Sequence, residues 1–276
     1  MLRAWVDALQ LNPRAVRPHR RPVRAPSLSA LLAKALDRLR ALSLALPPSL
    51  EMASVAIYRV DQAGNRRYLG SGCCYRDPKL FLTAHHCIAA TATEELRVAV
   101  SPYSQASEDA LVQRVVQHPS ADLAALMTAA GLSGTSPLDS VDSVILGGEE
   151  VSAHGFPLES EGAISEPTAK HYSGVIHRLL DYSDGAYSYE ALELSFGAPE
   201  GLSGSAVALP FRDRGLVAHD LVGIVTKDRE SARTLRTVTD VIDGDLRFQE
   251  RIDGVALHAI AVDLTALQDW LATLKP

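Results

Sequence analysis

The chain has 276 residues, of which 47% are hydrophobic and 22% charged, a composition typical of a globular protein with a substantial core. Its formal net charge of −6 argues against general nucleic-acid binding. The charge is unevenly spread: residues 1–50 hold nine basic and two acidic side chains, a net +7, which leaves −13 for the remainder. A basic N-terminal extension therefore precedes an acidic body, and we expect the two to have different roles.

The N-terminal extension, residues 1–50, is expected to be disordered at first and then helical. The stretch "PRAVRPHRRPVRAP" at 13–26 is rich in proline and arginine and should be extended or disordered. Leucines then recur at helical spacing until Pro47-Pro48 ends the pattern: Leu28, Leu32, Leu36, Leu39 and Leu46. We interpret this amphipathic helix as packing on the body, with a docking or membrane-surface element as the alternative. The extension would then bind a regulatory partner; nucleic acid is disfavoured, because aromatic residues for base stacking are few.

The cysteine count indicates a reducing compartment. Cys73, Cys74 and Cys87 are too few, and odd in number, for a disulfide framework. No apolar run approaches the ~20 residues that a membrane span needs. The leucine-rich segment is interrupted by charged residues and does not match a secretory signal. We therefore expect a cytoplasmic protein without a transmembrane segment.

From residue 53 the chain consists of short β-rich runs separated by turn residues. Runs such as "SVAIYRV", "KLFLTA", "ELRVAV", "ALELSF" and "LVGIVT" follow one another at fairly even spacing, which predicts an all-β sandwich or barrel. The segment "VDLTALQDWLATL" then predicts a C-terminal helix with its leucines on one face. Residues 229–253 are charged and weakly patterned, and they are expected to form an inserted loop.

The stretch "FLTAHHCIAA" at 81–90 carries the first candidate functional residues. Adjacent residues of a strand point to opposite faces, so His85 and His86 should not bind one metal ion together. Neither a Cys-x-x-Cys nor a His-x-x-x-His partner lies nearby. The sequence therefore predicts no metal site and no cofactor. An incidental pair of histidines at a strand end remains the structural alternative.

Three motifs in one order point to a known family. "LTAHHC" resembles the "TAAHC" element of chymotrypsin-like (trypsin-like) serine proteases, "QHPSADLAALM" resembles their "HP…DIALL" element, and "GAPEGLSGSAVAL" resembles their "GDSGGP" loop. The closest style is the bacterial, disulfide-poor branch. The resemblance implies a double six-stranded β-barrel over residues 53–276. The first barrel would span about 53–130, the second about 140–262, and the C-terminal helix about 263–274.

The resemblance also implies catalytic roles. Ser203 would be the nucleophile, His86 the general base, and Asp122 the carboxylate that orients His86. The backbone N–H groups of Gly201 and Ser203 would form the oxyanion hole. The implied activity is a serine endopeptidase that acts on a protein or peptide through an acyl-enzyme, with a narrow regulatory target. The alternatives are a catalytically silent pseudoprotease that binds proteins and an esterase-like acyl hydrolase on the same triad.

Two residues compete with these assignments. Ser133 stands in a second "GLSG" motif, but it follows Asp122 by only 11 residues and is better interpreted as part of the linker between the barrels. His85 occupies a position that is usually alanine in the family, and it should point away from the cleft.

The family pattern is not matched everywhere. Leu202 replaces the aspartate that pairs with a new N-terminus in zymogen-activated members, so activation of that kind is not expected. Cys87 is usually bridged in relatives; a bridge to Cys73 or Cys74 stays open, with free thiols preferred. By the resemblance, a substrate pocket would be formed by the following residues: Gly197 at its base, and Thr226, Lys227 and Asp228 in its wall.

Overall fold

The computed structural model describes residues 49–102, 109–141, 144–161, 164–213, 216–242 and 245–275. All of them belong to one compact unit, Pro47–Pro276. The predicted disordered stretch and leucine-rich helix of the N-terminal extension lie outside the described residues. Within the described part, no helix is long and apolar enough to cross a membrane.

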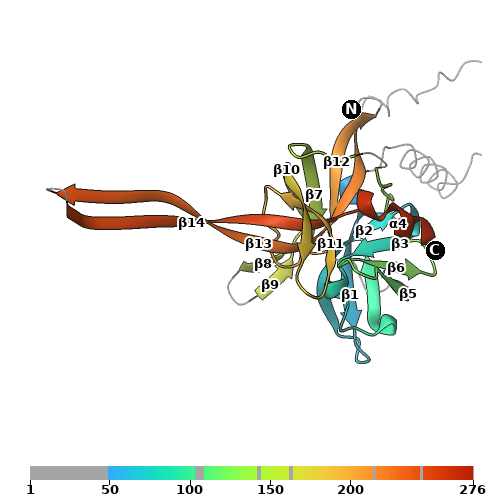
Figure 1. Ribbon diagram of the computed structural model, residues 1–276. Coiled ribbons are helices and arrows are strands. Elements are labelled where there is room, and N and C mark those ends of the chain that lie inside the picture. The colour runs from blue at the N-terminus through green and yellow to red at the C-terminus, as the bar shows by residue number, and fades with distance from the viewer. Residues whose placement is uncertain are drawn as a thin grey trace, which may run out of the picture. The chain divides into compact units, whose positions relative to one another are not determined.

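The first half of the unit is a closed antiparallel barrel with the strand order β1-β2-β3-β6-β5-β4 (Figure 1). Its interior is filled by side chains from strands on opposite sides, including Ile57, Phe81 and Leu126. Its strands and one short 3-10 turn are β1 (Ser54–Val60), β2 (Arg66–Tyr75), β3 (Asp77–Thr83), η3 (Thr93–Glu95), β4 (Leu96–Ala99), β5 (Ala110–Gln117) and β6 (Ala124–Thr128).

The second half is a closed barrel with the order β10-β11-β14-β13-β12-β7. Its interior is built from β-branched and other aliphatic side chains, including Val151, Ile176 and Val225. Its strands, with a small separate sheet of β8 and β9, are β7 (Glu150–Gly155), β8 (Leu158–Glu161), β9 (Ile164–Pro167), β10 (Lys170–Ser183), β11 (Ser188–Leu194), β12 (Ala206–Asp213), β13 (Leu216–Ile242) and β14 (Asp245–Asp263). The all-β double barrel predicted from the motifs is confirmed.

A shared apolar core joins the two barrels. Leu82 and Leu123 of the first barrel pack in one cluster with Ile224 and Leu264 of the second. The two barrels therefore hold a fixed mutual arrangement, which a site made from both requires.

A one-turn helix, α3 (Leu50–Ala53), precedes β1, and Ser49 caps it by accepting a hydrogen bond from the Met52 N–H at 3.2 Å.

The C-terminal helix is shorter than the sequence predicts. Strand β14 continues to Asp263, a 3-10 turn η5 (Thr265–Leu267) follows, and the α-helix α4 covers only Gln268–Thr273. The Asp263 carboxylate accepts hydrogen bonds from the N–H and hydroxyl of Thr265, which fixes the turn between strand and helix. Local capping at Asp263 thus delays the helix that the leucine spacing places from 263 onward.

The prediction of an inserted loop at 229–253 is wrong, because these residues form strands. These residues belong to β13 and β14, which pair in antiparallel register from Gly223↔Asp263 out to Ile242↔Asp245. Figure 1 shows this hairpin extending away from the second barrel. Its charged sequence lacks the alternation of a half-buried strand, so a hydrophobic pattern could not reveal it.

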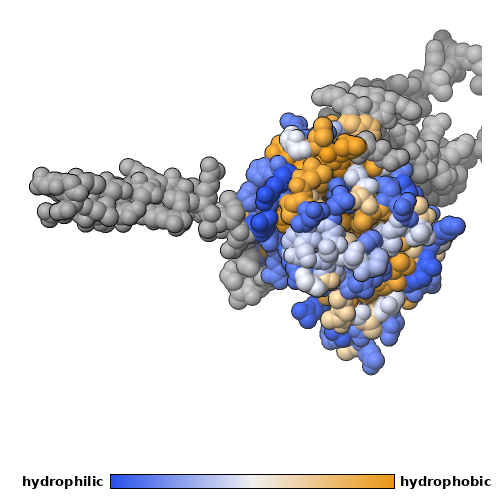
Figure 2. All heavy atoms as spheres, in the orientation of Figure 1, coloured by the Kyte–Doolittle hydropathy of each residue, from blue (hydrophilic) through white to orange (hydrophobic). Residues whose placement is uncertain are grey.

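The surface of the described unit is mixed in polarity. Figure 2 shows hydrophobic residues gathered toward the upper part of the visible face, with hydrophilic residues beside and below them. Large apolar side chains that stay exposed include Val144, Leu146 and Val217.

Candidate active site

His86 lies in a 3-10 turn, η2 (His85–Cys87), immediately after β3. The turn is closed by backbone hydrogen bonds from Cys87 N–H to Ala84 O and from Ile88 N–H to His85 O. The sequence-based view that the two histidines occupy a strand is therefore wrong. The turn still sends the rings to different partners, since His86 faces Asp122 and His85 faces Tyr187.

Asp122 is held in place by a turn between β5 and β6. The ring of His118 accepts hydrogen bonds from the N–H groups of Ser120 and Ala121, at 3.2 and 2.8 Å. The His118 N–H donates to Leu123 O, so the loop is closed on both sides of the carboxylate. Asp122 is only 3% exposed, and burial of a carboxylate requires strong hydrogen-bond donors.

His86 supplies both of the donors that Asp122 needs. The Nδ1 atom of His86 lies 2.6 Å from Oδ2 of Asp122, and the His86 backbone N–H donates to Oδ1 at 2.9 Å. This two-point contact fixes the ring and assigns the Nδ1 proton to the carboxylate side. Nε2 is left to face the cleft.

Cys87 lies beside the outer nitrogen of His86. Its Sγ atom is 3.6 Å from Nε2 of His86 and 3.8 Å from the carbonyl oxygen of Ser203. Burial would lower the pKa of His86, but the hydrogen bonds to Asp122 and Cys87 outweigh it and raise the pKa to about 10. The contact with Asp122 therefore stabilises the imidazolium that forms when His86 accepts a proton.

Ser203 lies at the centre of a tight turn between two glycines with positive φ, Gly201 at +88° and Gly204 at +90°. The turn is closed by the hydrogen bond from Ser205 N–H to Leu202 O, and Gly204 N–H donates to Val225 O of β13 at 2.7 Å. Only glycine takes such backbone angles without strain. The Ser203 hydroxyl donates to the backbone carbonyl of Thr226 at 3.1 Å.

The first barrel supports this turn through Tyr68 and Ser71. The Tyr68 hydroxyl lies 2.7 Å from Phe156 O and 2.9 Å from Gly201 O, and the Ser71 hydroxyl donates to Gly201 O at 2.8 Å. Ser71 N–H also donates to Ser203 O at 2.8 Å. The carbonyls of Gly201 and Ser203 are thus satisfied. Among the described residues their N–H groups donate to no other group.

One cleft contains these groups. A cavity of about 300 Å³ is lined by His86, Cys87, Gly201 and Ser203, with Tyr68, Leu158 and Glu200 around it. It lies between η2 of the first barrel and the 200–204 turn of the second. A serine hydroxyl, an imidazole and unpaired backbone donors therefore open into the same space, a combination suited to acyl transfer.

The four predicted pocket residues have different environments. Adding a Cβ to Gly197 would place it 2.9 Å from Cβ of Leu257, so this base position has no room for a side chain. The buried Thr226 hydroxyl lies 3.0 Å from the Tyr189 hydroxyl and donates to Ile260 O at 3.1 Å, so it is engaged within the second barrel.

The two charged pocket residues are both engaged. Lys227 Nζ donates to Tyr182 and to Asp184 at 2.6 and 2.8 Å, and this bond lowers the pKa of Asp184 to about 2. Asp228 Oδ1 accepts the Ala198 N–H at 3.1 Å. Lys227 therefore has a counter-charge in Asp184, whereas Asp228 has one oxygen engaged and keeps its negative charge.

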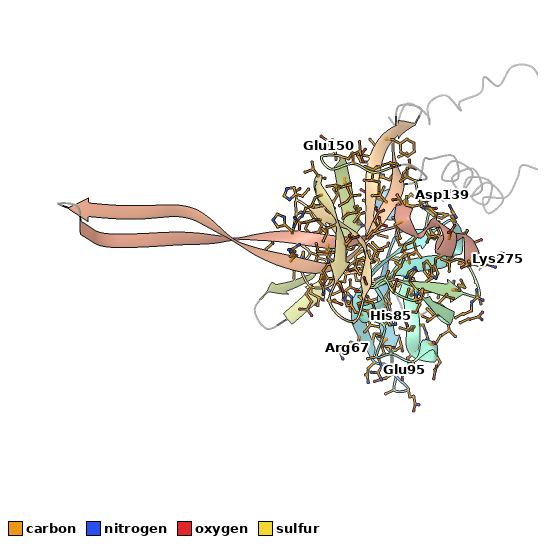
Figure 3. All side chains as sticks on the ribbon, in the orientation of Figure 1. Arg67, His85, Glu95, Asp139, Glu150 and Lys275 are labelled. Atoms are coloured by element: carbon orange, nitrogen blue, oxygen red, sulfur yellow. The ribbon has the colours of Figure 1, made fainter. Side chains whose placement is uncertain are left out.

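The competing residues lie elsewhere. His85 contacts the Tyr187 hydroxyl at 2.9 Å, across the junction of the two barrels, and Figure 3 labels it there. Ser133 is exposed in a turn of the β6–β7 connection, next to Gly134. All three cysteines are free, with Cys73 and Cys74 buried in β2 and Cys87 partly exposed. The preference for free thiols over a bridge is thereby supported.

The sequence analysis missed one cluster altogether. Ligand atoms of His177, Glu193 and His258 lie within 4.8 Å of one another on three strands of the second barrel. Glu193 follows His177 by 16 positions and His258 follows Glu193 by 65, so no local motif could connect them. Only the register of β10, β11 and β14 brings them together.

The fold and the cleft agree with the family profile that matches the chain. The profile described as "Trypsin-like peptidase domain" matches residues 70–215, more than half of the sequence. The chain therefore belongs to the chymotrypsin/trypsin-like serine protease family, as the three motifs predict.

Two solved structures show the same fold. The crystal structure of the active form of the Rv3671c protease from M. tuberculosis has a TM-score of 0.54 at 16% identity, with 95% of this chain and 96% of that chain covered. An inactive serine-to-alanine mutant of Rv3671c has a TM-score of 0.51 at 16% identity, with 91% and 95% covered. At this identity the likeness concerns the fold alone. No curated protein sequence matches the chain significantly.

Proposed function

We propose that the chain is a serine endopeptidase that uses Ser203, His86 and Asp122 as its catalytic triad. The observation that carries the proposal is the two-point contact of His86 with buried Asp122, at 2.6 and 2.9 Å, in the cleft that Ser203 also lines. A buried carboxylate so placed fixes the imidazole and stabilises its charged form during the reaction.

The reaction begins with the Ser203 hydroxyl turning from Thr226 O toward Nε2 of His86. In the neutral form of His86, Nε2 accepts the hydroxyl proton, and Oγ attacks the carbonyl carbon of the substrate peptide. The N–H groups of Gly201 and Ser203 receive the oxygen that becomes negative in the tetrahedral intermediate. His86 then protonates the leaving amine, and water hydrolyses the acyl-enzyme by the same steps in reverse order.

We propose a protein or peptide substrate and a narrow regulatory target. A preference for acidic substrates through Lys227 is disfavoured, because Lys227 is paired with Asp184, whereas Asp228 only accepts a backbone N–H and keeps its negative charge. Activation by a newly released N-terminus is also disfavoured, since Leu202 is fully buried in the apolar core of the second barrel and offers no ion-pair partner. A partner of the N-terminal extension remains the proposed route of regulation.

A second function, a silent protease fold that binds proteins, is favoured by one observation. Ser203 donates to Thr226 O instead of His86, and His86 contacts Cys87. If this arrangement persists when substrate binds, the serine is never activated.

Labelling with a fluorescent fluorophosphonate distinguishes the two functions, because this reagent reacts with activated serines. The experiment uses the full-length wild type with Ser203→Ala and Ser133→Ala as a matched pair, each removing the serine of one "GLSG" motif. The endopeptidase predicts labelling of the wild type and of Ser133→Ala, and none of Ser203→Ala. Absence of label on folded wild-type protein, together with absence of peptide hydrolysis, would support the silent fold.

A further inference from the structure

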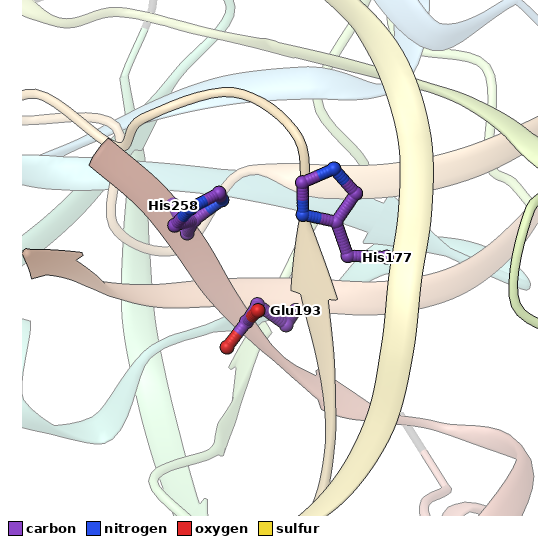
Figure 4. Close-up of side chains that lie close together, drawn as sticks. All are labelled: His177, Glu193 and His258. Carbon is purple, nitrogen blue, oxygen red and sulfur yellow. The ribbon is translucent and has the colours of Figure 1, made fainter. Parts of the chain in front are cut away.

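A cluster of two histidines and a glutamate lies on the outside of the second barrel, apart from the catalytic cleft. His177 comes from β10, Glu193 from β11 and His258 from β14, and one ligand atom of each lies within 4.8 Å of the others. Figure 4 shows the two imidazole rings next to each other with the Glu193 carboxylate beneath them. The ring centroids are 4.9 Å apart. Imidazole and carboxylate together are a donor set suited to divalent transition metals.

A β-bulge directs His177 into this cluster. In the β10–β11 ladder, Ile176 pairs with Leu194 and Arg178 with Glu193, so His177 is the additional residue between them. A bulge changes the direction of a side chain, and here both His177 and Arg178 are exposed while Ile176 is buried. Without the bulge, regular alternation would put His177 and Arg178 on opposite faces of the sheet.

The other two side chains are oriented by their own hydrogen bonds. His258 directs Nδ1 toward the carbonyl of Leu194 at 3.3 Å, which leaves Nε2 available. A histidine that ligates a metal commonly donates its other ring N–H to a backbone carbonyl in this way. Glu193 is 7% exposed, and its Oε2 accepts from Arg178 at 2.9 Å and Arg229 at 3.1 Å.

We propose that His177, Glu193 and His258 bind a divalent transition-metal ion of the zinc class. Ligands at ~2.1 Å around a tetrahedral ion lie about 3.4 Å from one another, so the three atoms must move inward by about 1 Å. Rotation of the exposed His177 side chain permits this movement. Three protein ligands leave a fourth position for water or for a group from a partner.

Arg178 and Arg229 oppose the metal electrostatically and set its affinity. Their side chains are 56% and 45% exposed, so solvent screens both charges and the guanidinium groups can turn away from Glu193. Removal of either charge should therefore tighten metal binding. If the arginines served only to hold Glu193 in place through ion pairs, their removal would weaken metal binding instead.

The position of the cluster connects it to the predicted substrate pocket. Leu257, the residue before His258, packs against Gly197, and Asp228, the residue before Arg229, holds the Ala198 N–H. Ala259, the residue after His258, donates its N–H to Phe196 O at 2.6 Å. A metal that fixes β10, β11 and β14 together therefore stiffens the segment that forms the base of the pocket.

Calorimetric titration of Zn²⁺ into tag-free, full-length protein carrying Ser203→Ala tests the proposal without use of catalytic activity. We expect a site whose affinity falls at least ~10-fold in His177→Ala, His258→Ala and Glu193→Gln. His171→Ala is the matched control, since it removes a partly exposed histidine from the same strand and should leave this affinity unchanged. Arg229→Gln should bind Zn²⁺ more tightly.

The outcomes are separable from effects on folding. His177 is exposed, so His177→Ala should keep the thermal midpoint that the metal-free parent has, and only the rise on adding Zn²⁺ should disappear. Equal affinities in His177→Ala and His171→Ala, or no Zn²⁺ binding by the parent, would overturn the proposal.

Discussion

The two barrels differ in how they orient the side chains that they contribute to the cleft. The first barrel presents His86 already fixed by Asp122, whose own turn is closed by His118. The second barrel presents Ser203 on a rigid glycine turn, yet its hydroxyl is bonded to Thr226 O within its own barrel. In the proposed triad, the base is therefore oriented and the nucleophile is not.

This difference indicates where the resting site can be controlled. Moving the Ser203 hydroxyl requires rotation about one side-chain bond, whereas moving His86 would break two hydrogen bonds to a buried carboxylate. Cys87 lies at the boundary, in contact with His86 and near Ser203. The predictions below first change the contact between His86 and Asp122, then the glycine turn that carries Ser203, and then Cys87 between them.

The largest effect is expected from Asp122→Asn, which changes the side chain that orients His86. The amide cannot stabilise the imidazolium and permits the wrong tautomer, so kcat should fall by ~10⁴ while the fold persists. Peptide or ester hydrolysis measures the loss, with Asp139→Asn as a control at an exposed ion pair with Arg76. Retention of most of the activity in Asp122→Asn would contradict the role given to the first barrel.

Gly201→Ala is expected to disturb the turn of the second barrel. Gly201 has a φ of +88°, and an added Cβ would lie 2.9 Å from Phe156 O, so the Gly201 N–H must shift. Loss of one oxyanion donor should lower kcat by ~10²–10³. Gly134→Ala is the matched control, because Gly134 has a φ of +89° but open space around its Cβ position. If both variants lose activity equally, strain and not the oxyanion hole explains the effect.

Alkylation should show whether Cys87 borders the groups that are proposed to react. Of the three cysteines only Cys87 is partly exposed, while burial raises the pKa of Cys74 to about 12 and also raises that of Cys73. Iodoacetamide should therefore modify one cysteine and block both hydrolysis and fluorophosphonate labelling, because the added group would fill the cleft at Nε2 of His86. The Cys87→Ala variant should resist the reagent. An alkylated wild type with full activity would show that Cys87 does not border the reacting atoms.

The smallest effect expected is a shift in the pH profile. The pKa of His86 is raised to about 10, so kcat/KM should increase with pH toward the alkaline range as the base loses its proton. In Cys87→Ala one of the contributions that raise this pKa is absent, and the rise should begin at lower pH. An identical profile in both proteins would rule out the Cys87 contact as a cause.

The same shift predicts a small change in stability. Because the folded-state pKa of His86 lies above its ordinary 6.5, its stabilising contribution is complete below pH 6.5 and is lost as pH rises through about 10. The side chain is 42% exposed, so solvent reduces the size of the effect. Urea unfolding of wild type and His86→Ala across this range should show the difference between them narrowing with pH.

The three motifs were readable because each is a local turn whose chemistry depends on adjacent residues. The glycines around Ser203 are needed at positive φ, and the apolar runs next to His86 and Asp122 predict the strands that hold them. The order of the motifs then indicated the double barrel. Local patterns failed at the 229–253 hairpin, whose pairing leaves no trace in hydrophobic alternation, and at the C-terminal helix, which the Asp263 cap delays.

The sequence by itself determined the fold family and the identities of the residues in the candidate triad, because both are encoded in short contiguous segments. Only the tertiary structure decided that Ser203 bonds to Thr226 O, that Cys87 contacts His86, and that Lys227 is paired with Asp184. It alone brought His177, Glu193 and His258 together. The physical reason is that strand register and side-chain rotamers follow from packing across the whole barrel, and no single segment contains that information.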